Sequence, residues 1–176
     1  MKIPPRNLRN IGSICLFVNG VILLFYAIVV LTFVHGVHWL ITLVAVLFLV
    51  ALPAIHHALI QARKGAARII SELLGAAMII IIVSDLLFAQ SILSLSNHAM
   101  VYALGNALFV ISIIMIGVIS LKSMFFKWFG YLSLLTGMIE LVTYVPRIPS
   151  LLSAASLIML AVWSFAFGLN LRKITK

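Results

Sequence analysis

The sequence predicts an all-α, polytopic membrane protein, a bundle of six transmembrane helices with both termini in the cytoplasm. Its composition is 65% hydrophobic and 9% charged, with a mean hydropathy of +1.30. Soluble domains are only about 45 to 50% apolar and carry about 25% charged residues. Two further observations are six long apolar runs and the concentration of basic residues in alternate connections. The bilayer is therefore the expected solvent for a single transmembrane domain over residues 1–176.

Each apolar run has 21 to 25 residues, and about 20 helical residues cross the hydrocarbon core of a bilayer. Because such runs lack strict alternation, they predict helices and exclude a β-barrel. The first run is about 24 residues, longer than the roughly 7 to 15 of a cleavable signal, so we expect an uncleaved first span. Short connections predict antiparallel sequential neighbours. The predicted helices are about 11–34, 38–61, 69–93, 98–121, 125–145 and 150–171.

The distribution of Lys and Arg predicts the topology. Eleven of the 12 basic residues fall on one side of the predicted bundle, which the positive-inside rule makes cytoplasmic. The basic connection 62–68 is either a topology determinant or a site for a lipid phosphate. We expect a multi-pass protein of the cell (inner) membrane, in contact with the bilayer and with anionic lipids at the cytoplasmic face. Another membrane protein or a second copy of the chain remains open as a partner, and no nucleic acid is expected.

All three acidic residues lie inside predicted spans: Glu72, Asp85 and Glu140. A carboxylate in hydrocarbon needs a partner, a proton or a wet cavity. Glu72 is expected near the start of the third helix, where it can pair with Arg68 in a structural role. From the cytoplasmic ends of their helices, Asp85 lies about 24 Å and Glu140 about 22 Å along, at 1.5 Å per residue. Both acids are therefore expected in the outer half of the bundle.

The fifth predicted helix carries a polar stripe within an arc of about 100°. Such a face is expected to point into the bundle. Gly130 and Gly137 beside it would let another helix approach closely. The stripe consists of Ser133, Thr136, Glu140, Thr143 and Tyr144.

The fourth predicted helix adds a second polar face, because His98, Tyr102 and Asn106 follow at i, i+4 and i+8. These groups share the depth of the two outer acids. We therefore expect one cavity, open to the outside, in which Arg147 is the natural counter-ion of a carboxylate. The predicted ligand-binding residues are Asp85, His98, Tyr102, Asn106, Glu140, Tyr144 and Arg147.

Metal binding and catalysis have weaker support. Three histidines at outer ends, His35, His38 and His98, together with a carboxylate would suit zinc, but their spacing does not place them on one helical face. Interfacial histidines are the better interpretation, so no metal and no cofactor are expected. The sequence has no catalytic serine, metalloprotease or phosphate-binding motif. Asp85 with His98 remains a conceivable acid and base pair, so the enzyme question is left open, with a non-enzymatic protein favoured.

Residues 106–173 resemble a family of small bacterial integral membrane proteins that is known as a domain of unknown function. The matching motifs are Phe126-Lys-Trp-Phe-Gly-Tyr-Leu-Ser-Leu-Leu-Thr-Gly, a proline turn, and a last span that ends Gly168-Leu-Asn-Leu-Arg-Lys. Phe126 stands where that family has a proline. The resemblance covers less than half of the chain and implies six spans, with no activity or site residues. In length and topology, the chain is also similar to six-span substrate-binding subunits of vitamin importers, but it lacks the small-residue coupling motif expected in their first helix.

Two functional hypotheses follow from these patterns. In the first, the protein binds a small ligand, ion or proton in an outward-facing polar cavity, as a transporter or its binding subunit. In the second, it is a structural or regulatory membrane subunit without a ligand, and its polar residues serve packing and assembly. Water access to Glu140 distinguishes the two.

Overall fold

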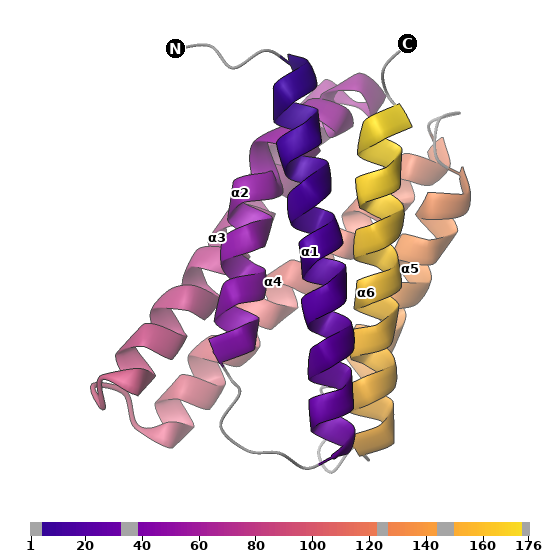
Figure 1. Ribbon diagram of the computed structural model, residues 1–176. Coiled ribbons are helices and arrows are strands. Elements are labelled where there is room, and N and C mark those ends of the chain that lie inside the picture. Colours follow the sequence, from indigo (N-terminus) through magenta and orange to yellow (C-terminus); the bar gives the residue numbers. More distant parts are fainter. Residues whose placement is uncertain (1–4, 33–38, 123–126, 144–149, 174–176) are drawn as a thin grey trace.

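The computed structural model describes residues 5–32, 39–122, 127–143 and 150–173 of the 176-residue chain (Figure 1). Over these residues the fold is all-α, as the sequence predicts. All of the helices except α5 are long and apolar enough to cross a membrane, which makes five such helices in the described chain. The helices are α1 (Pro5–Leu31), α2 (Trp39–Ala62), α3 (Lys64–Ala89), α4 (Leu95–Lys122), α5 (Lys127–Val142) and α6 (Ser150–Lys173).

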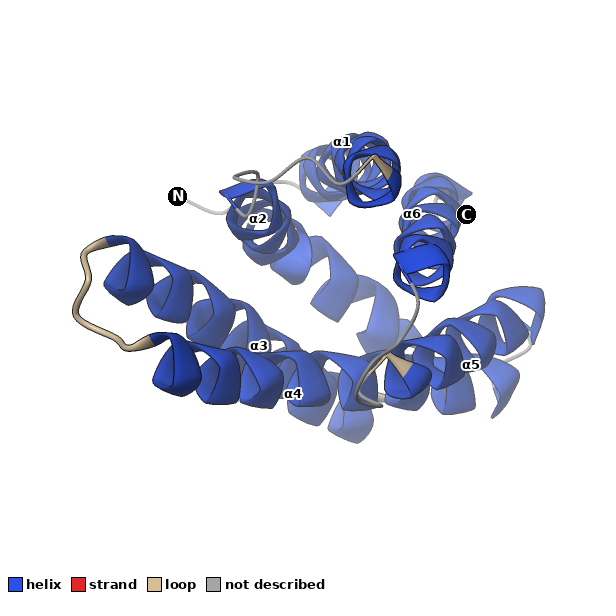
Figure 2. Ribbon diagram, turned by 90° about the horizontal axis from the view of Figure 1, so that it is seen from below, coloured by secondary structure: helices blue, strands red, loops and turns tan. Residues whose placement is uncertain are grey.

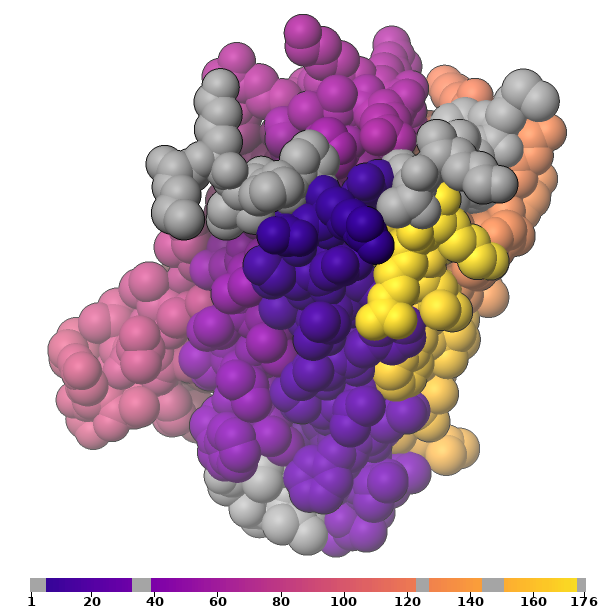
Figure 3. All heavy atoms as spheres, turned by 45° about the horizontal axis from the view of Figure 1, so that its top comes forward, coloured from indigo at the N-terminus to yellow at the C-terminus, as the bar shows by residue number. Residues whose placement is uncertain are grey.

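The six helices form a closed ring in chain order. α1 packs between α2 and α6, and each later helix packs against the next, so sequential helices are antiparallel neighbours (Figures 1 and 2). The short connections account for this order. The contact between α5 and α6 is the least extensive of the ring. The hairpin end of α3 and α4 projects to one side of the molecule (Figure 3).

All nine Lys and Arg residues in the described ranges lie at one end of the ring, here called the basic end. It contains the start of α1, the connection between α2 and α3, the end of α4, the start of α5 and the end of α6 (Figure 1). The opposite end is called the far end. Lys2, Arg147 and Lys176 lie outside the described residues.

At the basic end all of the described helices except α5 extend beyond the predicted apolar runs. α1 begins at Pro5, a residue favoured in a first helical turn, and α3 begins at Lys64. The predicted connection over 62–68 is therefore wrong, since Arg63 alone separates α2 from α3. Its N–H donates to the Leu59 carbonyl and its C=O accepts from the Ala67 N–H, as in a continuous helix. Hydropathy marks where a segment leaves hydrocarbon, whereas Ala, Lys and Arg are good helix formers that continue the helix into water.

At the far end three helices end earlier than predicted. α1 ends at Leu31, α3 at Ala89 and α5 at Val142. The last turn of α5 is closed by the N–H and the hydroxyl of Thr143, which both donate to the Glu140 carbonyl at 3.0 and 2.7 Å. With 16 residues, α5 is about 24 Å long at 1.5 Å per residue. Residues 144–149, which include the predicted end of this span, lie outside the described part.

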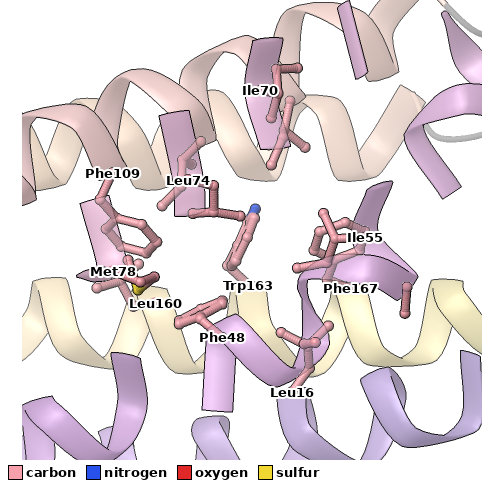
Figure 4. Packing of buried hydrophobic residues seen from close by; sticks show 14 of the residues in the cluster. Leu16, Phe48, Ile55, Ile70, Leu74, Met78, Phe109, Leu160, Trp163 and Phe167 are labelled. Atoms are coloured by element: carbon pink, nitrogen blue, oxygen red, sulfur yellow. The ribbon is translucent and has the colours of Figure 1, made fainter. Parts of the chain in front are cut away.

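The core of the ring is centred on Trp163, whose side chain is fully buried (Figure 4). Its ring lies 6.1 Å from Phe48, 5.9 Å from Phe129 and 5.3 Å from Phe167, measured between centroids. The indole N–H donates to the Ser133 hydroxyl at 2.8 Å. α2, α5 and α6 are thus joined by one aromatic cluster, which we call the Trp163 cluster, midway along the bundle.

Large apolar side chains are exposed on the outer faces of all six helices, α5 included. A soluble monomer rarely exposes such continuous apolar surface, while lipid tails cover it at no cost. This surface and the five long apolar helices mark a membrane-embedded protein. Examples from α1 to α6 are Val21, Val50, Ile79, Leu104, Met138 and Leu151.

The two glycines predicted to allow a close helix approach both face α4. A Cβ added to Gly130 would lie 2.9 Å from the backbone nitrogen of Leu121, and one added to Gly137 would lie 2.5 Å from Cγ1 of Ile114. The prediction is confirmed, and the packing explains why α5 turns its polar stripe away from α4 and toward the ring centre.

Candidate functional site

A cavity of about 540 Å³ occupies the far half of the ring and is lined by residues of all six helices. Its volume falls within the range of about 300 to 1,000 Å³ that is typical of small-molecule sites. Five of the seven predicted ligand-binding residues line it: Asp85, His98, Tyr102, Asn106 and Glu140. The other two, Tyr144 and Arg147, lie outside the described residues.

Asp85 is the best-connected polar group of the cavity. Thr42 of α2 donates its hydroxyl to Asp85 Oδ2 at 2.6 Å, and His98 Nε2 of α4 lies 3.0 Å from Asp85 Oδ1. With an ionised Asp85, the ring N–H of His98 is the donor. The side chains are only 14% exposed for Asp85 and 18% for His98. Both carboxylate oxygens are therefore engaged, and one acid joins three helices.

The His98 ring has a fixed orientation. It stacks on Phe88 with centroids 4.4 Å apart and lies 5.7 Å from the Tyr102 ring. His98, Tyr102 and Asn106 all line the cavity, as their shared helical face predicts. The stacked ring holds Nε2 toward the acid, so the Asp85–His98 pair is preorganised.

Glu140 enters the same cavity from α5, which is separated from α3 in the ring by α4. Its carboxylate accepts a hydrogen bond through Oε1 from the Ser156 hydroxyl of α6. Thr143 and Ser153 also line the cavity beside it. The described residues supply no further hydrogen-bond donor to this carboxylate, so its second oxygen is available to the cavity.

The rest of the polar stripe on α5 is divided between two environments. Ser133 and Thr136 are fully buried, and their hydroxyls donate to the carbonyls of Phe129 and Leu132 one turn back. Glu140 and the following Thr143 face the cavity. The stripe therefore faces inward over its described length, with dry packing toward the basic end and the cavity toward the far end.

The cavity walls are largely apolar and aromatic. Tyr26 of α1, Phe48 of α2, and Tyr102 and Phe109 of α4 all contribute to them. Phe48 and Phe109 meet edge to face with centroids 5.4 Å apart, and Phe48 also contacts Trp163. The Trp163 cluster thus closes the cavity toward the basic end.

Several lining residues were not anticipated from the sequence. Thr42 and Ser156 hold the two acids, while Tyr26, Phe48 and Phe109 form the aromatic walls. The sequence could have suggested Thr42 as a partner of Asp85, because it is the hydroxyl residue in the first turn of α2 and lies at the depth of Asp85.

The remaining chemistry-bearing residues lie elsewhere. Glu72 pairs with Arg68 at 2.8 Å on the exposed surface near the basic end, which confirms the predicted contact. It lies in the third turn of α3 and not the first, because α3 begins earlier than predicted. Within the described ranges no three His, Cys, Asp or Glu residues are grouped closely enough to hold a metal ion. His35 and His38 lie outside those ranges.

Comparison with known proteins adds no further assignment. No protein-family model, no curated protein and no solved structure matches this chain. The class that the fold and the cavity define is an all-α, membrane-embedded protein with a mixed polar and aromatic cavity in one half of its helix ring.

Proposed function

We propose that the chain is a six-span membrane protein that binds a small ligand in the cavity of its far half, as a transporter or as the binding subunit of one. The observation that carries the proposal is the convergence of Asp85, His98, Tyr102, Asn106 and Glu140 on one cavity of about 540 Å³. A cavity with apolar walls and a few convergent polar groups is the usual form of a ligand site.

The topology completes the proposal. α5 starts at Lys127 in the basic end and carries Glu140 to the cavity in the far half, which supports its crossing the bilayer like its neighbours. The nine described basic residues support a cytoplasmic basic end, in contact with anionic headgroups, and a cavity in the outer half.

A structural or regulatory subunit is the second candidate. It is favoured by the hydrogen bonds of the acids themselves, because Asp85 ties α3 to α2 and α4, while Glu140 ties α5 to α6. In that case the polar groups serve assembly of the ring, and the cavity is a packing defect filled by lipid. Water access separates the candidates, since a ligand site must be reachable from the aqueous phase.

The test places a thiol in the cavity wall. Cys15 is the sole cysteine of the chain and is buried in α1, so a Cys15→Ser background removes the native thiol. Ser153→Cys is a nearly isosteric change at the cavity wall, and Ser164→Cys is the matched control, because Ser164 is fully buried further along the same helix.

Both variants are treated in zwitterionic-lipid nanodiscs with uncharged hydroxyethyl methanethiosulfonate, and labelling is read by mass spectrometry. We expect Ser153→Cys to react and Ser164→Cys to react only after denaturation. Equal protection of both thiols in the folded protein would favour the structural subunit.

A further inference from the structure

The two acids of the cavity differ in how many of their carboxylate oxygens are hydrogen-bonded. Asp85 has both carboxylate oxygens occupied by Thr42 and His98. Glu140 has Ser156 on one oxygen, with no second donor among the described residues. Glu140 is therefore the acid with capacity left for a ligand.

Among the described residues that line the cavity, the charged side chains are mainly acidic. Its described lining contains two carboxylates and one imidazole, and no Lys or Arg. The imidazole of His98 is already directed at Asp85. All nine described Lys and Arg residues lie at the basic end, on the other side of the Trp163 cluster. A low-dielectric cleft lined by one sign of charge concentrates counter-ions of the opposite sign, so this cavity favours cations.

The aromatic walls select among cations. Tyr26, Phe48, Tyr102 and Phe109 line the cavity from three helices. Aromatic faces attract a desolvated organic cation, and recognition of quaternary ammonium groups by several rings is the best-known use of this interaction. A metal cation needs several oxygen ligands at short range, carboxylates prominent among them, and the described residues contain no group of three His, Cys, Asp or Glu side chains that could hold one. An alkylammonium needs one carboxylate together with apolar and aromatic surface, which this cavity supplies.

From these three observations we propose that the cavity takes a small organic cation, an alkylammonium or quaternary ammonium compound with an apolar body. Glu140 is the counter-ion and the rings of α1, α2 and α4 form the walls. The inference rests on the proposed function of the cavity and names its ligand class. The Asp85–His98 pair is a fixed part of the wall.

The test uses the Ser153→Cys thiol as a charge sensor. Its reaction rates with trimethylammonium-ethyl and sulfonatoethyl methanethiosulfonate are compared in zwitterionic nanodiscs and normalised to those of Asn97→Cys, an exposed position at the same end of the bundle. We expect the cationic reagent to be favoured by about tenfold over the anionic one, the lower end of the enrichment that a charged cleft produces. Glu140→Gln should remove most of this preference.

Glu72→Gln is the matched control, because it makes the same change in net charge at the exposed Arg68 pair near the basic end. It should leave the preference unchanged. In a second measurement, phenyltrimethylammonium should slow labelling of the Ser153→Cys thiol by the uncharged reagent, and benzenesulfonate should not. Tyr26→Leu, made with Glu140 intact, should weaken that protection severalfold, which keeps the proposal testable if Glu140→Gln does not fold.

The outcomes separate this inference from the proposed function. If the uncharged reagent labels the thiol but neither cation preference nor phenyltrimethylammonium protection is found, the ligand class is wrong and the cavity remains a site. A preference that survives Glu140→Gln would overturn the role of Glu140. If the uncharged reagent does not reach the thiol in the folded protein, both proposals fail.

Discussion

Removing Asp85 and His98 together should destabilise the protein by less than the sum of the two single removals. The 3.0 Å contact joins two side chains that are 14% and 18% exposed. A hydrogen bond to a charged group contributes about 1.5 to 3 kcal/mol in proteins generally, whereas double-mutant cycles between membrane helices average about 0.6 and reach about 1.7 kcal/mol. Because this contact is charge-assisted and mostly buried, we expect a coupling energy of about 1 to 1.5 kcal/mol, in the upper part of the membrane range.

The cycle uses Asp85→Ala, His98→Ala and the double variant, with the free energy of unfolding measured by titration of mixed micelles with a denaturing detergent. The His98 ring also stacks on Phe88, but that loss occurs in both arms that remove the ring and cancels in the coupling energy. Additivity within about 0.3 kcal/mol would show that the pair is not coupled.

A parallel cycle of Asp85→Ala with Arg147→Ala tests the sequence-based expectation that Arg147 is the counter-ion of an acid. Because Thr42 and His98 occupy both oxygens of Asp85, we expect this second cycle to be additive. A coupling energy larger than that of the His98 cycle would refute the geometric argument and assign the charge of Asp85 to Arg147.

Three further outcomes are expected. Gly117→Ala should destabilise the protein by about 1 to 3 kcal/mol through overpacking, because the added Cβ would lie 3.0 Å from backbone atoms of α5. Gly65→Ala has open space around it and should stabilise α3 by about 0.5 to 1 kcal/mol. Similar denaturation midpoints for the two variants would contradict the α4–α5 packing. Trp163→Phe should lower stability by about 1 kcal/mol or more, since it removes a buried hydrogen bond, and an unchanged melting temperature would argue against that bond. Cysteines placed at Asn97 and at Lys176 should be labelled in whole cells by a membrane-impermeant thiol reagent only at position 97, and the reverse pattern would invert the proposed topology.

The inward faces and depths of the site residues could be predicted from the sequence because a helix fixes both. The spacing of His98, Tyr102 and Asn106 defines one face whatever the neighbours are, and the rise per residue places Asp85 and Glu140 at similar depths. These two properties are sufficient to place five side chains in the far half of one ring, where the structure brings them to one cavity.

The partners of these residues could not be predicted, because they depend on how each helix rotates about its axis. α2 is apolar on nearly all sides, so no stripe in its sequence indicates that Thr42 and Phe48 face the ring centre. α6 distributes its serines and apolar residues with almost no preferred face, so its sequence does not indicate that Ser156 meets Glu140. Hydropathy also measures the apolar length of a segment and not its hydrogen bonding, so the extension of α3 back to Lys64 was missed.

If the cavity binds a ligand as proposed, the uneven closure of the ring would link cavity occupancy to ring width. α5 and α6 share the least extensive contact, and across the described part of this seam run two side-chain hydrogen bonds, Trp163 to Ser133 and Ser156 to Glu140. Ser156 occupies one oxygen of Glu140, so a ligand that drew the whole carboxylate away from Ser156 would weaken the seam at its cavity end, while the Trp163 cluster holds the other end. Linkage makes the effect reciprocal, since anything that spreads α5 from α6 frees Glu140 and raises affinity. Lateral pressure from the lipid on the α5–α6 side of the ring would then change ligand affinity in the manner of an allosteric effector.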